Sequence, residues 1–133
     1  MTIDALFEAA REAQSRAYAP YSGFKVGAAV QGESGAVYAG CNVENAAYPA
    51  GTCAEEGALA AMVAAGERRI KAILVVGDGQ KLVTPCGACR QRIREFGTAD
   101  TPIHVAGCHG LRSTFTLDDL LPCAFGPDNL QAV

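Results

Sequence analysis

The sequence predicts an α/β protein built as a three-layer sandwich, in which helices flank a mixed five-stranded sheet. Apolar residues recur first at helical and then at strand spacing, in the order helix, strand, strand, helix, strand, helix, strand, strand, helix. Gly and Pro residues fall singly between these segments, so the 133 residues are expected to form a single domain spanning residues 1–133. The right-handed crossover rule predicts that the central β-α-β-α-β part is parallel.

The first predicted element is a helix over residues 3–18, which ends before Pro20. Its larger apolar residues follow an i, i+3, i+4, i+7 pattern: Ile3, Leu6, Phe7 and Ala10. Two strands follow, over residues 24–31 and 36–43. The loop Gly32-Glu33-Ser34-Gly35 between them has the composition of a hairpin turn, so the two strands should be antiparallel neighbours.

The second half of the chain alternates between strands and helices. After an irregular stretch over residues 45–51, an Ala-rich segment predicts a helix over residues 53–65 that ends at Gly66. The remaining predicted elements are a continuous apolar strand over residues 72–76, a helix over 86–96, strands over 103–106 and 112–116, and a short helix beginning at Thr116.

Composition excludes several classes of protein. Half of the residues are hydrophobic and 19% are charged, which favours a folded core over disorder. The longest apolar run, residues 58–65, is far short of the roughly 20 residues that span a bilayer. No signal peptide is evident, so a cytoplasmic location is expected. The net charge of −3 and the lack of a Lys and Arg cluster argue against a nucleic-acid partner.

Three of the six cysteines have the spacing of a metal site. In a chain expected in the reducing cytosol, metal ligation or catalysis is favoured over three disulfides. Cys86 and Cys89 lie three positions apart at a predicted helix start, and Cys53 begins the preceding helix. Three thiolates leave one position of a tetrahedral zinc ion open for water, as in catalytic sites. One Zn²⁺ per chain is therefore expected.

Glu55 is the candidate catalytic residue. It lies two residues beyond Cys53, in the segment Cys53-Ala54-Glu55, and zinc deaminases combine such a carboxylate with Pro-Cys-x-x-Cys, here residues 85–89. A structural alternative is a capping box, in which Thr52 and Glu55 satisfy backbone N–H groups at the helix start.

With these motifs, the chain resembles the small, homotetrameric, three-cysteine cytidine deaminases. The resemblance extends over nearly the whole chain, through the segments at residues 20–29, 40–46 and 120–126. It implies zinc-dependent hydrolysis of cytidine and 2′-deoxycytidine to uridine and 2′-deoxyuridine with release of ammonia, a step of pyrimidine salvage. In this interpretation Glu55 carries protons from water to the ring nitrogen and to the departing amine.

The substrate site is expected around Asn42 and Glu44, whose side chains leave the same face at a strand end and suit ribose hydroxyls. The lack of a Gly-rich phosphate cradle or basic cluster near these motifs favours a nucleoside over a nucleotide. The resemblance assigns the Asn42 and Glu44 pair to the sugar. It further implies substrate contacts from Phe24, from Ala46 and from the backbone of Ala54 and Cys86. The alternative role of Phe24 is that of a core residue in a strand. The resemblance also implies that Tyr48 and Phe125 contribute to the site of a neighbouring subunit.

One position departs from the resembling family, which usually has Arg directly after the catalytic Glu. This chain has Glu56, a further negative charge beside three thiolates unless it faces solvent. Arg90 and Gln91 could supply compensating donors. Two other functions stay open: deamination of another aminopyrimidine compound, such as an aminonucleoside antibiotic, and a zinc-stabilised nucleoside-binding protein without catalysis.

Overall fold

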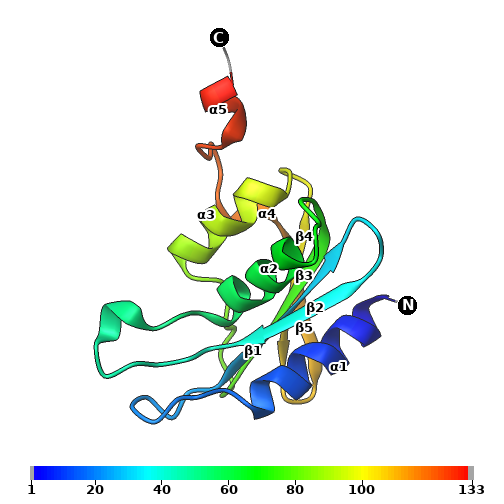
Figure 1. The fold of residues 1–133 in the computed structure, drawn as a ribbon. Helices are drawn as coiled ribbons and strands as arrows, with labels where there is room; N and C mark the ends of the chain where they lie inside the picture. Colours follow the sequence, from blue (N-terminus) through cyan, green and yellow to red (C-terminus); the bar gives the residue numbers. More distant parts are fainter. Residues whose placement is uncertain (1, 132–133) are drawn as a thin grey trace.

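The computed structural model describes residues 2–131, and its helices and strands alternate as the sequence predicts. The strands are β1 (Val26–Gly32), β2 (Val37–Cys41), β3 (Ile70–Gly77), β4 (Pro102–Gly107) and β5 (Gly110–Thr116). The helices are α1 (Thr2–Ser15), α2 (Ala54–Ala64), α3 (Gly87–Phe96), α4 (Leu117–Leu120) and α5 (Pro127–Gln131), with a short 3-10 helix at Tyr48–Ala50. Figure 1 shows their arrangement.

The five strands form one mixed sheet in the order β2-β1-β3-β4-β5, which confirms the predicted fold class. β3 and β4 are parallel, with Ile73 opposite Ile103, and the other neighbouring pairs are antiparallel. The prediction of a parallel central part needs one correction: β2, β3 and β4 run in the same direction, but β1 lies between β2 and β3. β1 takes this inner position because its residues are largely buried, whereas those of β2 are partly exposed, as on an edge strand.

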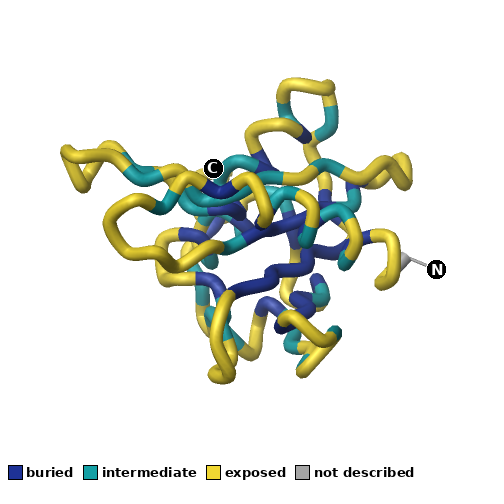
Figure 2. Tube along the Cα trace, turned by 90° about the horizontal axis from the view of Figure 1, so that it is seen from below, coloured by how far each residue is buried: buried dark blue, intermediate teal, exposed yellow. Residues whose placement is uncertain are grey.

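Helices cover both faces of the sheet, as the three-layer prediction requires (Figure 1). On one face, Leu6 and Ala10 of α1 pack against Leu74 and Val76 of β3. On the other face, the side chains that alternate with these pack against α2 and α3. This second cluster includes Ile73, Val75, Leu59, Met62 and Ile93. Figure 2 shows the buried strands at the centre of the molecule and the exposed loops around them.

The ends of several elements differ from the prediction. α1 ends at Ser15 and not at Tyr18, because the backbone N–H of Tyr18 donates to Asn42 O at 3.0 Å and so leaves the helix. β1 begins at Val26, which places Phe24 outside the sheet with 40% of its surface exposed. Its alternative role as a core strand residue is therefore wrong. The sequence analysis also missed the 3-10 helix and α5, which have too few residues for a periodic pattern.

The strand directions bring the starts of α2 and α3 together. Because β2 and β3 run in the same direction, their carboxyl ends lie at one edge of the sheet, and the connections to α2 and α3 both begin there. α2 also packs very closely on β2: a Cβ atom at Gly40 would lie 2.5 Å from the backbone nitrogen of Ala58. A side chain at position 40 would therefore displace the helix that carries Glu55.

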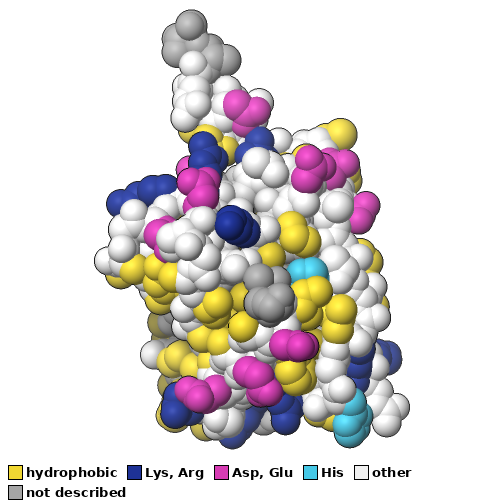
Figure 3. Space-filling view, turned by 90° about the vertical axis from the view of Figure 1, so that its right-hand side faces the viewer, with side chains coloured by type: hydrophobic (Ala, Val, Ile, Leu, Met, Phe, Trp, Pro, Cys, Tyr) yellow, Lys and Arg dark blue, Asp and Glu magenta, His cyan; other side chains and the backbone are white. Residues whose placement is uncertain are grey.

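Two features of the structure concern its helices and the charges on its surface. Within residues 2–131, no helix is long and apolar enough to cross a membrane. On the face drawn in Figure 3, Lys and Arg side chains are interspersed with Asp and Glu. This face therefore offers no continuous basic patch of the kind that binds a phosphate backbone.

Candidate active site

Three cysteines meet at the starts of α2 and α3. Cys53 is the residue that caps α2, Cys86 caps α3, and Cys89 lies in the first turn of α3. Their sulfur atoms all lie within 4.8 Å of one another, and the Sγ atoms of Cys53 and Cys86 are 3.9 Å apart. A tetrahedral zinc ion with Zn–S distances of about 2.3 Å requires sulfurs about 3.8 Å apart. The cluster thus fits the predicted three-cysteine zinc site.

The thiols of this triad differ in their environment. Burial raises the pKa of Cys53 and, more strongly, that of Cys89, so both favour the protonated form in the absence of a metal ion. Burial acts in the same direction on Cys86, but hydrogen bonds from the backbone and side chain of Cys89 and from Cys53 hold its pKa below the usual value. A bound dication would replace these protons and turn all three groups into thiolate ligands.

Glu55 lies beside the triad and is almost completely buried, with 4% of its surface exposed. This burial raises the pKa of its carboxyl group above the usual value; a hydrogen bond with the Cys89 thiol and the charge of Arg92 act in the opposite direction. A raised pKa makes a carboxylate a stronger base and makes its protonated form more accessible as an acid. Glu55 therefore has the environment of a general acid and base.

The helix cap is made by a different glutamate. α2 begins after Cys53, and Glu56 is its third residue, so the capping box consists of Cys53 and Glu56. The backbone N–H of Cys53 donates to Glu56 Oε1 at 3.2 Å. The alternative capping box of Thr52 and Glu55 is thus wrong by one position, and the Glu55 carboxyl group is not used as a cap.

A cavity of about 610 Å³ opens in front of the triad. Cys53, Cys86 and Glu55 line this cavity together with the predicted substrate residues Asn42, Glu44, Tyr48 and Ala54. The structure adds residues that the sequence analysis missed: Tyr21, Ser22, Val26, Val83 and Thr84. These residues belong to the loops before β1 and α3 or to the first residue of β1, and no periodic pattern identifies such positions.

Asn42 and Glu44 hold the loop before β1 against this cavity. The Asn42 side chain accepts from Val26 N and donates to Phe24 O, each at 2.9 Å. The Glu44 carboxylate accepts from Tyr21 N at 2.9 Å and Ser22 N at 3.1 Å, and from the Ser22 hydroxyl. The hydrogen bonds from Ser22 lower the pKa of Glu44, so this group stays ionised at neutral pH.

Three predicted substrate residues do not line the cavity of their own chain. Phe24 and Ala46 are exposed outside it. Phe125 has 58% of its surface exposed and lies between α4 and α5, on the segment that extends away from the sheet (Figure 1). Tyr48, in contrast, lies at the cavity rim, with its ring edge against Tyr21 at a centroid distance of 6.2 Å.

Arg90 and Gln91, the expected hydrogen-bond donors to the thiolates, donate to other groups. Arg90 donates to Pro85 O, Leu120 O and the Thr84 hydroxyl, and Gln91 donates to Phe125 O. The guanidinium group that reaches the triad belongs to Arg92, whose Nη1 lies 3.7 Å from Cys89 Sγ. The spacing of three residues between Cys89 and Arg92 places both on one helix face, a signal that the sequence contained.

Comparisons with known proteins agree with this site. Residues 1–105 match a family described as "Cytidine and deoxycytidylate deaminase zinc-binding region". A cytidine deaminase of Sporosarcina psychrophila is 42% identical over 98% of this chain and 96% of its own length. The crystal structure of cytidine deaminase from Burkholderia pseudomallei has a TM-score of 0.87 at 47% identity, with 94% of this chain and all of that chain covered.

A second solved structure, cytidine deaminase from Mycobacterium tuberculosis, has a TM-score of 0.79 at 39% identity and covers 92% of this chain and 96% of its own. Cys53, Glu55, Cys86 and Cys89 all lie within the matched residues 1–105. The chain therefore belongs to the cytidine and deoxycytidylate deaminase family.

Proposed function

We propose that this protein hydrolyses cytidine and 2′-deoxycytidine to uridine and 2′-deoxyuridine with release of ammonia, in pyrimidine salvage. The observation that carries this proposal is the position of Glu55: a buried carboxyl group with a raised pKa lines the same cavity as Cys53 and Cys86. The relatives named cytidine deaminase, at 42% and 47% identity, support it.

Cys53, Cys86 and Cys89 would hold one Zn²⁺ per chain. When bound, the metal lowers the pKa of a water molecule in its open coordination position and so makes that water a nucleophile at neutral pH. The positions of the three residues at two helix starts suit this role, because the partial positive charge of a helix N-terminus favours thiolates.

Glu55 moves the protons that the reaction requires. Water attacks the ring carbon that bears the amino group, and Glu55 accepts the proton that the water loses. Glu55 then delivers a proton to the adjacent ring nitrogen. A second proton goes from the attacking hydroxyl through Glu55 to the amine, and the carbon–nitrogen bond breaks to release ammonia. The sum is cytidine plus water giving uridine plus ammonia, with no net change on Glu55.

Glu44 and Asn42 would bind the sugar. A carboxylate has about four lone-pair sites, and the loop before β1 occupies three of those on Glu44. The remaining site can accept a ribose hydroxyl. The first backbone N–H group of α2, at Ala54, has no i−4 partner within the helix and can contact the base.

The charge of the cavity favours a nucleoside over a nucleotide. Among its lining residues within residues 2–131 there is no Lys or Arg, and its wall carries the carboxyl groups of Glu44 and Glu55. A phosphate group in this cavity would meet negative charge without a compensating cation.

A homotetramer would complete the cavity. Phe125 is exposed on the extended C-terminal segment, and Tyr48 has 77% of its surface exposed. A largely apolar groove lined by Leu59, Val63 and Phe96 also lies between α2 and α3. These surfaces suit contacts between copies, through which Phe125 would reach a neighbouring site. A cytoplasmic location fits the six free thiols, which stay reduced there.

Loss of the cytidine absorbance tests the proposal. Purified protein should remove it and release ammonia in equal amount. The same assay on a panel of amino-heterocycles, including an aminonucleoside antibiotic, tests the alternative substrates. Turnover restricted to another compound would overturn the cytidine assignment, and cytidine binding without ammonia release would indicate a binding protein.

A further inference from the structure

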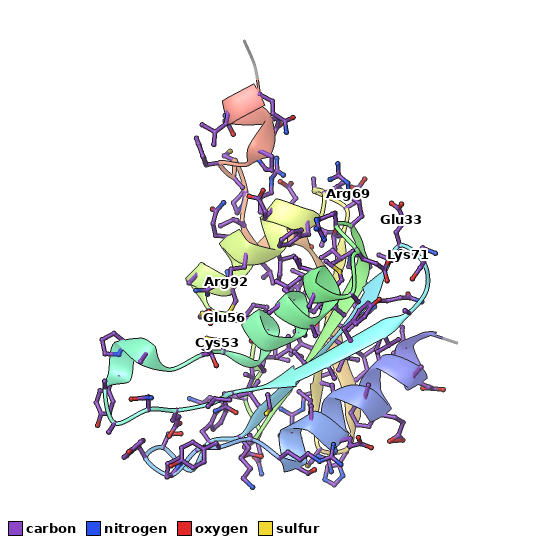
Figure 4. The ribbon with its side chains drawn as sticks, viewed as in Figure 1. Glu33, Cys53, Glu56, Arg69, Lys71 and Arg92 are labelled. Atoms are coloured by element: carbon purple, nitrogen blue, oxygen red, sulfur yellow. The ribbon has the colours of Figure 1, made fainter. Side chains whose placement is uncertain are left out.

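Two oppositely charged residues, neither of them a metal ligand, bridge the starts of α2 and α3. Arg92 Nη2 lies 3.6 Å from Glu56 Oε2, while Arg92 Nη1 lies 3.7 Å from Cys89 Sγ. The other carboxylate oxygen of Glu56 accepts the backbone N–H of Cys53. Figure 4 shows Cys53, Glu56 and Arg92 next to one another at this end of the two helices.

The net negative charge of a metal-bound triad favours a cation beside the thiolates. A dication with three thiolates has a net charge of −1, and Glu56 adds a further negative charge on the Cys53 side. Arg92 is always protonated and donates toward the buried sulfur of Cys89. Its charge therefore offsets that of Glu56 and leaves a hydrogen-bond donor directed at a thiolate.

We propose that Arg92, held in place by Glu56, is the positioning residue that stabilises the metal-bound form of the cysteine triad and so determines how tightly the protein retains zinc. This inference rests on the proposed zinc site. The three sulfurs would hold a metal ion as thiolates, so the metal-bound triad is anionic. A fixed cation 3.7 Å from Cys89 Sγ stabilises that form, and residues next to metal ligands typically alter metal affinity by about 10- to 100-fold.

The arrangement also assigns a role to Glu56. Its carboxylate accepts the cap hydrogen bond with one oxygen and fixes the guanidinium group with the other. Without Arg92, Glu56 would place an uncompensated negative charge beside the thiolates. The loss caused by removing Arg92 should consequently be smaller when Glu56 is also neutralised.

Zinc transfer from the holoenzyme to the chromophoric chelator 4-(2-pyridylazo)resorcinol tests the proposal. Arg92→Gln should weaken zinc retention about 10-fold or more. Arg92→Lys, which keeps the charge, should restore much of it. Glu56→Gln removes a negative charge but also the ion pair that holds Arg92, so it should weaken zinc retention less than Arg92→Gln does. The double variant Arg92→Gln/Glu56→Gln should retain zinc better than Arg92→Gln alone. Arg16→Gln, which breaks the exposed pair of Arg16 with Glu12 at the end of α1, is the matched control.

Arg92→Lys separates a charge effect from a packing effect, because Lys keeps the charge and lacks the planar guanidinium group. Zinc retention that is unchanged in Arg92→Gln, or lost equally in Arg92→Lys, would overturn the inference while the zinc site stands. A parent protein that binds no zinc would instead contradict the proposed function.

Discussion

Glu56 Oε1 lies 3.2 Å from the backbone nitrogen of Cys53, so the helix cap and the candidate proton carrier are adjacent but separate glutamates. Glu56 satisfies the start of α2, and Glu55 faces the cavity from the first turn of the same helix. Each carboxyl group can thus be changed without removing the function of the other. This separation makes the site testable by single substitutions.

The metal site should depend on both helix starts. The parent protein should contain one zinc ion per chain, and the Cys86→Ala/Cys89→Ala variant should contain none, because a single remaining thiolate cannot hold the ion. Metal analysis by mass spectrometry measures this. Cys108→Ala, at an exposed cysteine in the turn between β4 and β5, should keep the full zinc content. Full zinc in the double variant would refute the assigned ligands.

Glu44→Ala should lower kcat/KM for cytidine by about 10- to 100-fold, as expected for the loss of a hydrogen bond to a charged group. The zinc content should not change, because Glu44 is not part of the triad. Glu44 also holds Tyr21 and Ser22, so Ser22→Ala is needed as a control that removes one of these contacts and keeps the carboxylate. Equal losses in both variants would assign Glu44 to the loop and not to the sugar.

Glu67 gives the fold a defined pH dependence. The backbone N–H of Ser34 and the hydroxyls of Tyr38 and Ser34 donate to it and lower its pKa. Because the pKa is lower in the folded state, this stabilisation is present above the unfolded-state pKa and is lost as the pH falls through the folded-state value. Glu67→Gln should therefore lower the thermal unfolding midpoint at neutral pH and have progressively less effect in acid.

Glu12→Gln, at an exposed carboxylate paired with Arg16, provides the comparison for Glu67. It should leave the unfolding midpoint nearly unchanged over the same pH range, since exposed ion pairs contribute little to stability. A difference between Glu67→Gln and the parent that grows in acid would show that the sign of this argument is wrong.

Phe125→Ala should lower kcat/KM for cytidine although Phe125 does not line the cavity of its own chain. The physical reason is that its exposed ring would close the cavity of a neighbouring subunit. Leu130→Ala, at another exposed apolar residue of the C-terminal segment, is the matched control. Sedimentation equilibrium should give a tetramer for the parent, and a monomer with full activity would exclude any shared site.

The sequence contained the signals for the metal triad but only for part of the cavity around it. Cys86 and Cys89 are three residues apart on one helix, and Cys53 starts another, so local spacing predicts their convergence. Thr84 and Tyr21 reach the cavity from irregular loops, whose path depends on long-range hydrogen bonds such as that from Tyr21 N to Glu44. Such contacts leave no periodic pattern in the chain.

The difference between local spacing and long-range contacts also explains why the predicted helix cap and strand arrangement needed correction. The predicted helix cap lies one residue before the observed cap because the patterns Thr52-x-x-Glu55 and Cys53-x-x-Glu56 overlap. Only the backbone geometry decides where α2 begins. The strand order was incomplete because crossover rules give strand direction, whereas the position of β1 between β2 and β3 follows from its burial. For Arg92 the sequence did contain a signal, because it lies three residues after Cys89 and so on the same helix face.

The most direct measurement is the turnover of cytidine by Glu55→Gln, with the zinc content determined on the same sample. Gln keeps the size of the side chain, and Glu56 still caps the helix, so fold and zinc should be retained. Gln cannot carry a proton, so kcat should fall by about 100- to 10,000-fold. The matched variant Glu56→Gln should stay close to the parent. A zinc-loaded Glu55→Gln enzyme with parental kcat would contradict the proposed mechanism.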